Sequence, residues 1–380
     1  TQRVGAYPAE GFQQVDHPLP MLSLANSFDF TQLQNWHNRV TNLLGVDKFS
    51  MVCELKVDGL AVALTYQDGV LIQGATRGNG YRGEDVTHNL RTIKSIPLAL
   101  QCRCPSRLEV RGEVFMSNIA FTKLNRDQAA MGKPLYANPR NTAAGSVRQL
   151  DPVVTASRNL DVCIYGLGYI QDDSMPDNHW DTLNRLGKLG FRISPHNRIC
   201  NTLGEVEDYY RQWLEKRDSM SFQADGIVVK INSFNFQANL GVVGREPRWA
   251  VAYKFPAEQV ITRLLDIGIN VGRTGSLNPY AVLEPVIVGG ATIKVASLHN
   301  EEDIHRKDIR IGDWVVVERA GEVIPQVIGP VPTRRAGNEK KFKMPETCTV
   351  CATTVVKSLG DAVHRCPNVS CPAQFSELFQ

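Results

Sequence analysis

Charged side chains recur inside otherwise apolar, strand-like segments of this 380-residue chain. In the segment Met51-Val-Cys-Glu-Leu-Lys-Val-Asp-Gly59, charged and apolar residues alternate. Because successive side chains of a β-strand point to opposite faces, Glu54, Lys56 and Asp58 are predicted to share one face. One such segment alone would be typical of a half-exposed strand whose charges face solvent.

Three further segments repeat the pattern, which makes simple solvent exposure a poor explanation. Glu109, Arg111 and Glu113 alternate with apolar residues, and Lys230 and Lys254 each stand alone among apolar neighbours. A charge on a central strand is costly unless it meets a partner or a ligand. We therefore predict that these groups converge on one sheet face. They would form a pocket for a phosphate-bearing polar ligand, with lysines on phosphate and carboxylates on base or ribose groups.

Lys56 is the candidate nucleophile of this pocket. A lysine amine attacks phosphorus only when it is neutral, so the sequence predicts a lowered pKa for Lys56. Nearby cations such as Lys230, Lys254 or a metal ion would lower it.

Four of the nine cysteines crowd into a short segment near the end of the chain. They are Cys348, Cys351, Cys366 and Cys371, with two, fourteen and four residues between successive members. Two close thiolate pairs separated by a short loop predict a structural zinc site without an open position for catalysis. His364 is a less favoured substitute ligand, and Cys102 and Cys104 are expected to be unliganded. The other cysteines are scattered and no secretory segment is visible, which indicates reduced thiols.

The length predicts two or three domains, and no apolar stretch is long enough to predict a membrane span. The spacing of apolar residues predicts an α+β region followed, after Pro256, by short strands of a small barrel up to about residue 331. Strands are expected within 50–76, with a hairpin turn at 67–69, and at 108–116, 160–170, 224–231 and 248–255, and helices at 27–45, 117–131, 178–189, 205–217 and from Asn138. The net charge of +3 is too small to bind polyanions by bulk charge alone.

The segment Glu54-Leu-Lys56-Val-Asp58-Gly59 resembles the adenylation motif of nucleotidyltransferases, which include DNA ligases, RNA ligases and capping enzymes. Other stretches are more specifically similar to bacterial NAD-dependent DNA ligases: Met21 to Leu24, Ala75 to Gly80, Gly83 to Thr87, Arg111 to Phe115, Asn138 to Gly145, Asp225-Gly226, Lys254 to Pro256 and Gly272 to Gly275. The resemblance implies a multidomain α+β fold. An adenylation domain with antiparallel sheets (1–255) would precede an OB-fold β-barrel (256–345) and a small four-cysteine zinc finger (346–380).

The resemblance implies a reaction in three steps. Lys56 would attack the α-phosphate of NAD to form lysyl-AMP, AMP would move to the 5′-phosphate of a nick, and the 3′-hydroxyl would seal the strand. Magnesium or manganese would assist, and zinc would be structural. Nucleotide contacts would come from Ser23, Leu24, Glu54, Asp58, Arg77, Glu113, Lys230 and Lys254, and DNA contacts from Arg140, Arg148, Arg273 and Arg319. Without the resemblance, Arg140 reads more simply as a solvated residue in a first helical turn.

The expected partner is nicked double-stranded DNA in replication and repair, acted on by a cytoplasmic bacterial monomer that does not contact membranes. The chain departs from the family in having Asn79 where Asp is usual and Ala352 where Gly is common. It is expected to be a fragment without the N-terminal segment that binds nicotinamide mononucleotide and without the C-terminal helix–hairpin–helix and BRCT domains. The alternatives are an ATP-using ligase or capping enzyme, and a non-catalytic DNA-binding module.

Overall fold

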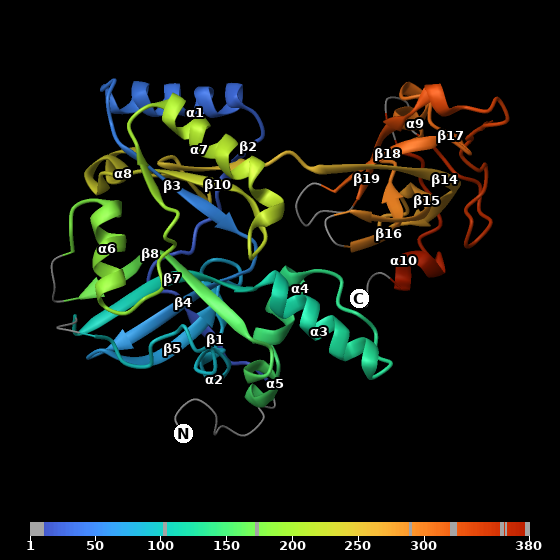
Figure 1. Cartoon of the computed structure of the whole chain (residues 1–380). Coiled ribbons are helices and arrows are strands. Elements are labelled where there is room, and N and C mark those ends of the chain that lie inside the picture. The colour runs from blue at the N-terminus through green and yellow to red at the C-terminus, as the bar shows by residue number, and fades with distance from the viewer. Residues whose placement is uncertain are drawn as a thin grey trace. The chain divides into compact units, whose positions relative to one another are not determined.

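The structure is a computed structural model that describes residues 11–101, 105–171, 175–288, 291–319, 325–357, 361 and 363–376, without the side chains of 291, 319, 375 and 376. The chain divides into two compact units, Thr1–Phe255 and Pro256–Gln380 (Figure 1). Cys102 and Cys104 lie outside the described residues. Among the helices that are described, none is long and apolar enough to span a bilayer.

The first unit contains a five-stranded sheet that is covered on one face by helices. Its strand order is β2 (Ala25–Ser27), β13 (Ala250–Lys254), β10 (Ala224–Ile231), β3 (Met51–Val57) and β9 (Arg198–Cys200). Helices α1 (Phe30–Leu44), α7 (Leu203–Glu215) and α8 (Phe234–Leu240) lie on one side of it (Figure 1). Met51, Cys53 and Leu55 pack in the same hydrophobic cluster as Leu33 of α1 and Val206 of α7. The odd-numbered residues of β3 therefore face the helices.

A second sheet in the same unit is antiparallel throughout. Its order is β5 (Val70–Thr76), β4 (Leu60–Gln67), β7 (Arg107–Met116) and β8 (Leu160–Gln171). The β4–β5 turn at Asp68 and Gly69 has φ values of 47° and 78°, as a tight hairpin turn requires. Leu108, Val110 and Val114 of β7 are buried in a separate hydrophobic cluster. The even-numbered residues of β7 thus form the core, which leaves the odd-numbered charges on the opposite face.

Shorter elements complete the first unit. They are β1 (Gln14–Asp16) paired with β6 (Arg82–Glu84), β11 (Val242–Val243) paired with β12 (Glu246–Pro247), and helices α2 (Thr87–Leu90), α3 (Asn118–Ala130), α4 (Pro139–Val147), α5 (Pro152–Ala156) and α6 (His179–Lys188). Asp29 caps α1 by accepting from Gln32 N, and Gly45 ends it at φ 66°. The expected helix at 27–45 is therefore present with slightly tighter bounds.

The second unit is built on a closed barrel, as the glycine-separated strands after Pro256 predict. Its strand order is β14 (Glu258–Val271), β15 (Leu277–Val288), β16 (Ala291–Ser297), β19 (Gln326–Pro330) and β18 (Trp314–Arg319). Helix α9 (Glu301–Arg306), the pair β17 (Arg310–Ile311) and β20 (Lys340–Lys341), and α10 (Pro372–Ser376) flank the barrel.

The charge-bearing strands do not belong to one sheet, which corrects the prediction of a single polar sheet face. Strands β3, β10 and β13 lie in the five-stranded sheet, whereas β7 lies in the four-stranded one. The alternation along each strand is present, but alternation does not determine which sheet a strand joins. The charges come from the polar faces of two sheets, and the two faces meet.

Candidate active site and four-cysteine cluster

Contacts between the two sheets show that their polar faces lie together. Lys230 of β10 donates from Nζ to the carbonyl oxygen of Tyr165 on β8 at 2.8 Å. Glu113 of β7 lies within electrostatic range of Lys56 on β3. Arg111 points elsewhere, because its guanidinium donates to the carbonyl oxygens of Leu19 and Pro20 at 2.7 and 2.8 Å. Arg111 therefore supports a loop in this structure.

Lys56 and Lys254 share one carboxylate oxygen. Lys56 Nζ lies 3.1 Å from Asp225 Oδ2, and Lys254 Nζ lies 2.5 Å from the same atom. The register of β10 against β3 shifts between Ala224 and Ile227, so a bulge surrounds Asp225. A bulge changes the direction of a side chain relative to a regular strand, and here Asp225 lies beside both lysines.

The pKa of Lys56 is raised, and the expectation of a lowered pKa is wrong for this form of the protein. Burial lowers the pKa, but the charge and hydrogen bond of Asp225 outweigh burial and favour the ammonium form. For Lys254 the balance is reversed: burial and the charge of Lys56 lower its pKa despite Asp225. The two lysines share one carboxylate oxygen, yet the pKa of Lys56 is raised and the pKa of Lys254 is lowered.

Glu113 stands on the opposite sheet, where burial raises its pKa to about 7 against the opposing charges of Lys56 and Arg140. Arg140 is held by the first turn of α4, whose cap Asn138 accepts from Asn141 N at 2.7 Å. The Arg140 Nη1 atom lies 2.7 Å from Asp58 Oδ1. Arg140 is thus ion-paired beside the lysine site rather than only solvated.

A buried polar triad lies farther along the same face. Lys230 Nζ is 2.8 Å from Glu54 Oε1, and His179 Nε2 is 2.6 Å from that oxygen. The three side chains are between 5% and 9% exposed. Burial raises the pKa of Glu54, but Lys230 and His179 outweigh burial and hold the pKa below its usual value. Such a triad presents fixed donors and acceptors to a polar ligand.

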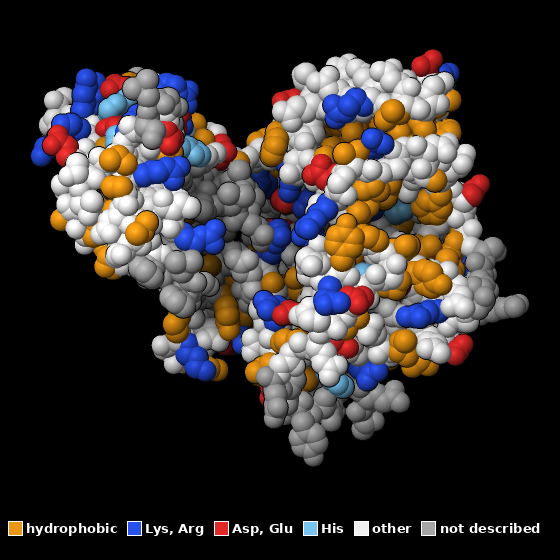
Figure 2. All heavy atoms as spheres, turned by 180° about the vertical axis from the view of Figure 1, so that it is seen from behind, with side chains coloured by type: hydrophobic (Ala, Val, Ile, Leu, Met, Phe, Trp, Pro, Cys, Tyr) orange, Lys and Arg blue, Asp and Glu red, His pale blue; other side chains and the backbone are white. Residues whose placement is uncertain are grey.

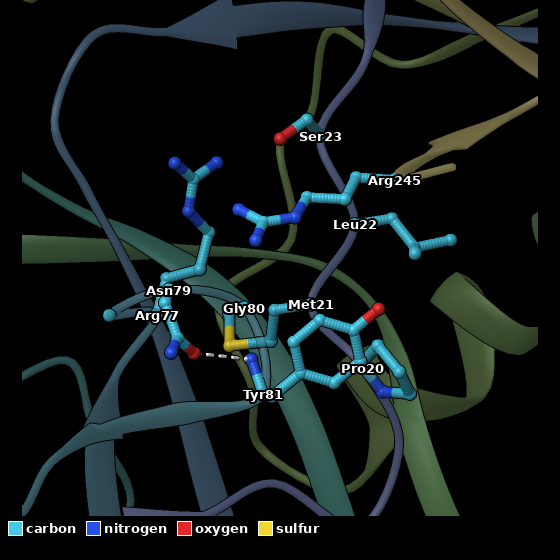
Figure 3. Close-up of a pocket in the computed structure, with 10 residues that line it drawn as sticks. Pro20, Met21, Leu22, Ser23, Arg77, Asn79, Gly80, Tyr81 and Arg245 are labelled. Atoms are coloured by element: carbon cyan, nitrogen blue, oxygen red, sulfur yellow. Dashed lines mark hydrogen bonds between the residues drawn. The ribbon is translucent and has the colours of Figure 1, made fainter. Parts of the chain in front are cut away.

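A pocket opens beside these groups, between the loop at residues 20–23 and the turn that follows β5 (Figure 3). Ser23 and Arg77 line it, together with Asn79, Tyr81 and Arg245. Leu24, expected from sequence to contact the same ligand, is absent from the lining. Figure 3 shows the guanidinium groups of Arg77 and Arg245 on the same side of the pocket as the Ser23 hydroxyl.

Of the remaining basic residues expected at the site, Arg148 belongs to the first unit and Arg273 and Arg319 belong to the second. Arg148 forms an ion pair with Glu84 at 2.7 Å. In the second unit, Arg273 is exposed in the turn between β14 and β15, and the side chain of Arg319 lies outside the described part of the structure. On the face drawn in Figure 2, lysine and arginine side chains are dispersed among apolar and uncharged ones, in keeping with the small net charge.

Sequence reasoning missed three features of the site: the partner role of Asp225, the contact of His179 with Glu54, and Arg245 in the pocket. The Asp-Gly pair before an apolar strand was a usable signal for Asp225, since the pair predicts a bulge or turn. His179 and Arg245 have no local signal, because their sequence neighbours are ordinary for a helix start and a hairpin.

The four cysteines of the tail come together as the spacing predicts. Their sulfur atoms all lie within 4.8 Å of one another, with Cys348 3.9 Å from Cys371 and Cys351 3.5 Å from Cys366. Tetrahedral zinc with Zn–S bonds of about 2.3 Å would separate its sulfurs by about 3.8 Å. The donor set therefore fits zinc. His364 is not part of the cluster, and its Nε2 lies 3.6 Å from Glu301.

The cysteine segment packs on the barrel rather than forming a free tail. Cys348, Cys366 and Cys371 belong to the hydrophobic cluster of the barrel strands. Gly275 O accepts from Cys366 N at 2.8 Å, and Leu277 N donates to His364 O at 2.8 Å. Ala352 follows the first cysteine pair with φ 56°, a conformation that glycine adopts without strain.

Family models match almost the whole chain, in the order in which these structures occur. The NAD-dependent DNA ligase adenylation domain matches residues 9–258, the NAD-dependent DNA ligase OB-fold domain matches 261–339, and the NAD-dependent DNA ligase C4 zinc finger domain matches 347–373. The chain belongs to the NAD-dependent DNA ligase family.

Curated relatives named DNA ligase are similar over the full chain. The chain is 57% identical to one from Dehalococcoides mccartyi and 50% identical to one from Roseiflexus castenholzii, covering 100% of this chain and 57% and 55% of those proteins. The chain thus spans little more than half the length of these relatives. A solved structure of a Lig E DNA ligase has a TM-score of 0.44 at 12% identity, covers 83% of this chain and 100% of that chain, and is too distant to add to the assignment.

Proposed function

We propose that this chain carries out the nucleotidyl-transfer chemistry of NAD-dependent DNA ligation, with Lys56 as the nucleophile. The observation that carries the proposal is the partly buried arrangement around Lys56: Asp225 and Lys254 on its own sheet, Glu113 on the other sheet, and the Arg140–Asp58 ion pair beside them. Partial burial and an adjacent cation suit an amine nucleophile, because both favour the neutral amine that attacks phosphorus.

The first step transfers AMP from NAD to Lys56. Lys56 loses a proton, its Nζ attacks the α-phosphorus, and a P–N bond forms as the P–O bond to nicotinamide mononucleotide breaks. Asp225 Oδ2, 3.1 Å from Nζ, is the acceptor within reach of that proton. Lys254 disfavours a second positive charge beside it and assists the loss of the proton.

The later steps use the same groups. The P–N bond breaks as AMP moves to the 5′-phosphate of a nick, and the 3′-hydroxyl then displaces AMP to form the phosphodiester. Each step is a phosphoryl transfer, in which positioning and charge neutralisation supply most of the catalysis.

Two carboxylates beside Lys56 fit a magnesium ion. Asp225 Oδ1 is buried without a hydrogen-bond partner among the described atoms, and Glu113 is close enough to interact electrostatically with Asp225. Carboxylate oxygens of this kind suit Mg²⁺, which would neutralise phosphate charge and favour the neutral amine of Lys56.

The nucleotide contacts follow from the same arrangement. The buried Glu54–Lys230–His179 triad suits the edge of the adenine ring, and Glu113 and Asp58 suit the ribose and phosphate region. Arg77 and Ser23 line the adjacent pocket on the phosphate side. Leu24 is retained as a contact of the bound nucleotide, although it does not line the pocket.

The DNA contacts belong to both units. We assign Arg140 to the nick phosphate, since it lies in the first turn of α4 and helix N-termini attract anions. Arg148, which follows the last turn of α4, is assigned to the same phosphate from the family resemblance alone. Arg273 and Arg319 are assigned to the duplex backbone from the barrel, because five-stranded barrels of this kind commonly bind nucleic acid.

The proposed domain division is 1–255, 256–345 and 346–380, supported by the compact units that meet at Phe255 and Pro256. Zinc bound by the four clustered cysteines would stabilise the third of these domains. We further propose that the protein acts as a monomer in the bacterial cytoplasm, on nicked double-stranded DNA during replication and repair.

The direct test is the intact mass of the purified chain after incubation with NAD and Mg²⁺. We expect a gain of one AMP with NAD, no gain with ATP, and no gain in Lys56→Ala. A gain with ATP alone would instead assign an ATP-using nucleotidyltransferase.

A second assay is needed because the chain spans little more than half the length of its relatives. Sealing of a pre-adenylated nick requires no NAD, so it tests the final step by itself. If the chain neither gains AMP nor seals this nick, but binds DNA as well as Lys56→Ala does, the proposal is refuted in favour of a DNA-binding module.

A further inference from the structure

The pocket beside the lysine site contains two positive charges and no negative one. Ten residues line it, and they include Arg77 and Arg245 but no aspartate or glutamate. In the described part of the chain, neither arginine forms an ion pair with an acidic residue. Two guanidinium groups that converge without a carboxylate repel each other, so the arrangement favours a bound anion.

The backbone that carries Arg77 is held in a fixed turn. Gly80 N donates to Arg77 O at 2.9 Å, and the side chain of Asn79 accepts from Tyr81 N and Arg82 N, both at 2.9 Å. Gly78 has φ 54°, and a Cβ at that position would come within 2.0 Å of Arg82 O. The turn therefore directs Arg77 into the pocket at little conformational cost to ligand binding.

The backbone that carries Arg245 is fixed from the other side. Arg245 lies in the β11–β12 hairpin, and its carbonyl oxygen accepts from Ser23 N at 2.9 Å. Its guanidinium carbon lies 6.0 Å from the centre of the Tyr81 ring. Figure 3 shows that Arg77 and Arg245 come from opposite walls and direct their guanidinium groups toward the same space.

The pocket and the lysine site are linked through Tyr165, which interacts electrostatically with Arg77 and contacts Lys230. Burial raises the pKa of Tyr165 above its usual range, and the charges of Arg111 and Arg77 oppose that rise. The carbonyl oxygen of Tyr165 accepts from Lys230. An anion between the two arginines would thus lie next to the proposed nucleotide site.

We propose that Arg245 and Arg77 together form a subsite for a phosphate group, with Arg245 as a phosphate-binding residue of this chain. The identity of the anion rests on the proposed function, because NAD and the nicked DNA strand both carry phosphate groups. The phosphate would be either the one of NAD that leaves with nicotinamide mononucleotide or one of the DNA strand. Asn79 strengthens the subsite, since it holds the turn without adding the negative charge that aspartate would bring.

The test is the affinity for inorganic pyrophosphate, measured by calorimetry at constant ionic strength. We expect Arg245→Ala to weaken binding about tenfold, the loss typical of one charge-assisted hydrogen-bonding group. Arg39→Ala, an exposed arginine on α1, is the matched control and should bind like the parent. Equal affinities for Arg245→Ala and Arg39→Ala would overturn the proposal.

A second variant tests the charge of the pocket without removing an arginine. Asn79→Asp keeps the oxygen that accepts from Tyr81 N and Arg82 N and adds one negative charge. We expect several-fold weaker pyrophosphate binding with an unchanged melting temperature. Unchanged affinity in this variant would contradict an anion subsite.

Two activity measurements identify the source of the phosphate. A higher KM for NAD in lysine adenylation by Arg245→Ala, with normal sealing of a pre-adenylated nick, assigns the subsite to the dinucleotide. The reverse result assigns it to DNA. Lys56→Ala should bind pyrophosphate normally, so failure of the adenylation chemistry and failure of the subsite give different results.

Discussion

The protonation of Lys56 is decided by its distances from neighbouring charges. Asp225 shares one oxygen between Lys56 and Lys254, and this arrangement keeps Lys56 charged in the form described here. Nucleophilic attack requires the neutral amine, so the resting site is not yet reactive. Transfer of the lysine proton to Asp225 Oδ2, assisted by the neighbouring charge of Lys254, would give the neutral amine once the nucleotide is bound.

Glu113 gives a stability prediction with a definite sign. Its pKa is raised from 4.5 to about 7, so the folded state binds the proton more tightly than the unfolded state. This stabilisation is fully present below pH 4.5 and is lost as the pH rises through 7. Relative to Glu113→Gln, the parent should lose up to about 3 kcal/mol of unfolding free energy over that interval.

The measurement is urea unfolding of the parent and of Glu113→Gln at several pH values. The difference between the two proteins isolates Glu113, because the other titrating groups are common to both. A difference that stays constant between pH 4.5 and 7 would show that Glu113 keeps its ordinary pKa.

At the scale of single elements, the bulge at the start of β10 determines the site. Gly226 follows Asp225 and faces Lys254 in the β10–β13 pairing. A Cβ on Gly226 would come within 2.3 Å of the carbonyl oxygen of Tyr253. No side chain fits there unless the two strands separate.

Gly226→Ala should therefore destabilise the first unit by about 1–3 kcal/mol, the usual cost of forcing atoms into a packed region. It should also slow adenylation of Lys56, because separation of the strands displaces Asp225 and Lys254. Urea unfolding and the intact-mass assay measure the two effects.

Gly187→Ala is the matched control for this substitution. Gly187 lies in α6, where the nearest atom to an added Cβ is 3.7 Å away. Alanine is favoured over glycine inside a helix by about 0.5–1 kcal/mol, so this variant should be slightly more stable. Similar destabilisation by both variants would mean that the close approach at Gly226 is unimportant.

At the scale of the whole molecule, each unit has cores of its own. The two clusters of the first unit share no residue with the cluster that unites the barrel and the cysteines. Loss of zinc should consequently loosen the second unit and leave the first unit unchanged.

Hydrogen exchange before and after zinc chelation tests this separation. We expect faster exchange at residues 347–373 and in the 272–277 turn, because Gly275 and Leu277 are hydrogen-bonded to the cysteine segment. Exchange around Lys56 should not change, and added zinc should restore the slow rates. Unchanged exchange in the 272–277 turn would show that the cysteine segment does not support the barrel.

Much of the fold was predictable because its signals are local. The expected strands at 108–116 and 224–231 correspond to Arg107–Met116 and Ala224–Ile231. Asn138 predicted a helix start and caps α4. Two-residue alternation, capping side chains and turn residues act within a few positions of each other, so the sequence displays them directly.

Local sequence patterns indicate which side chains share a strand face and which cysteines come together, because strand alternation and chelate spacing are short-range properties. No local pattern indicates that the polar faces of two sheets meet, that His179 lies 2.6 Å from Glu54 across 125 positions, or that Arg245 faces Arg77, because these contacts form only when distant segments pack together. The same tertiary contacts reversed the expected pKa of Lys56. Its charge state depends on an anion 169 residues away, and the distance to that anion is fixed only when β3 and β10 pair.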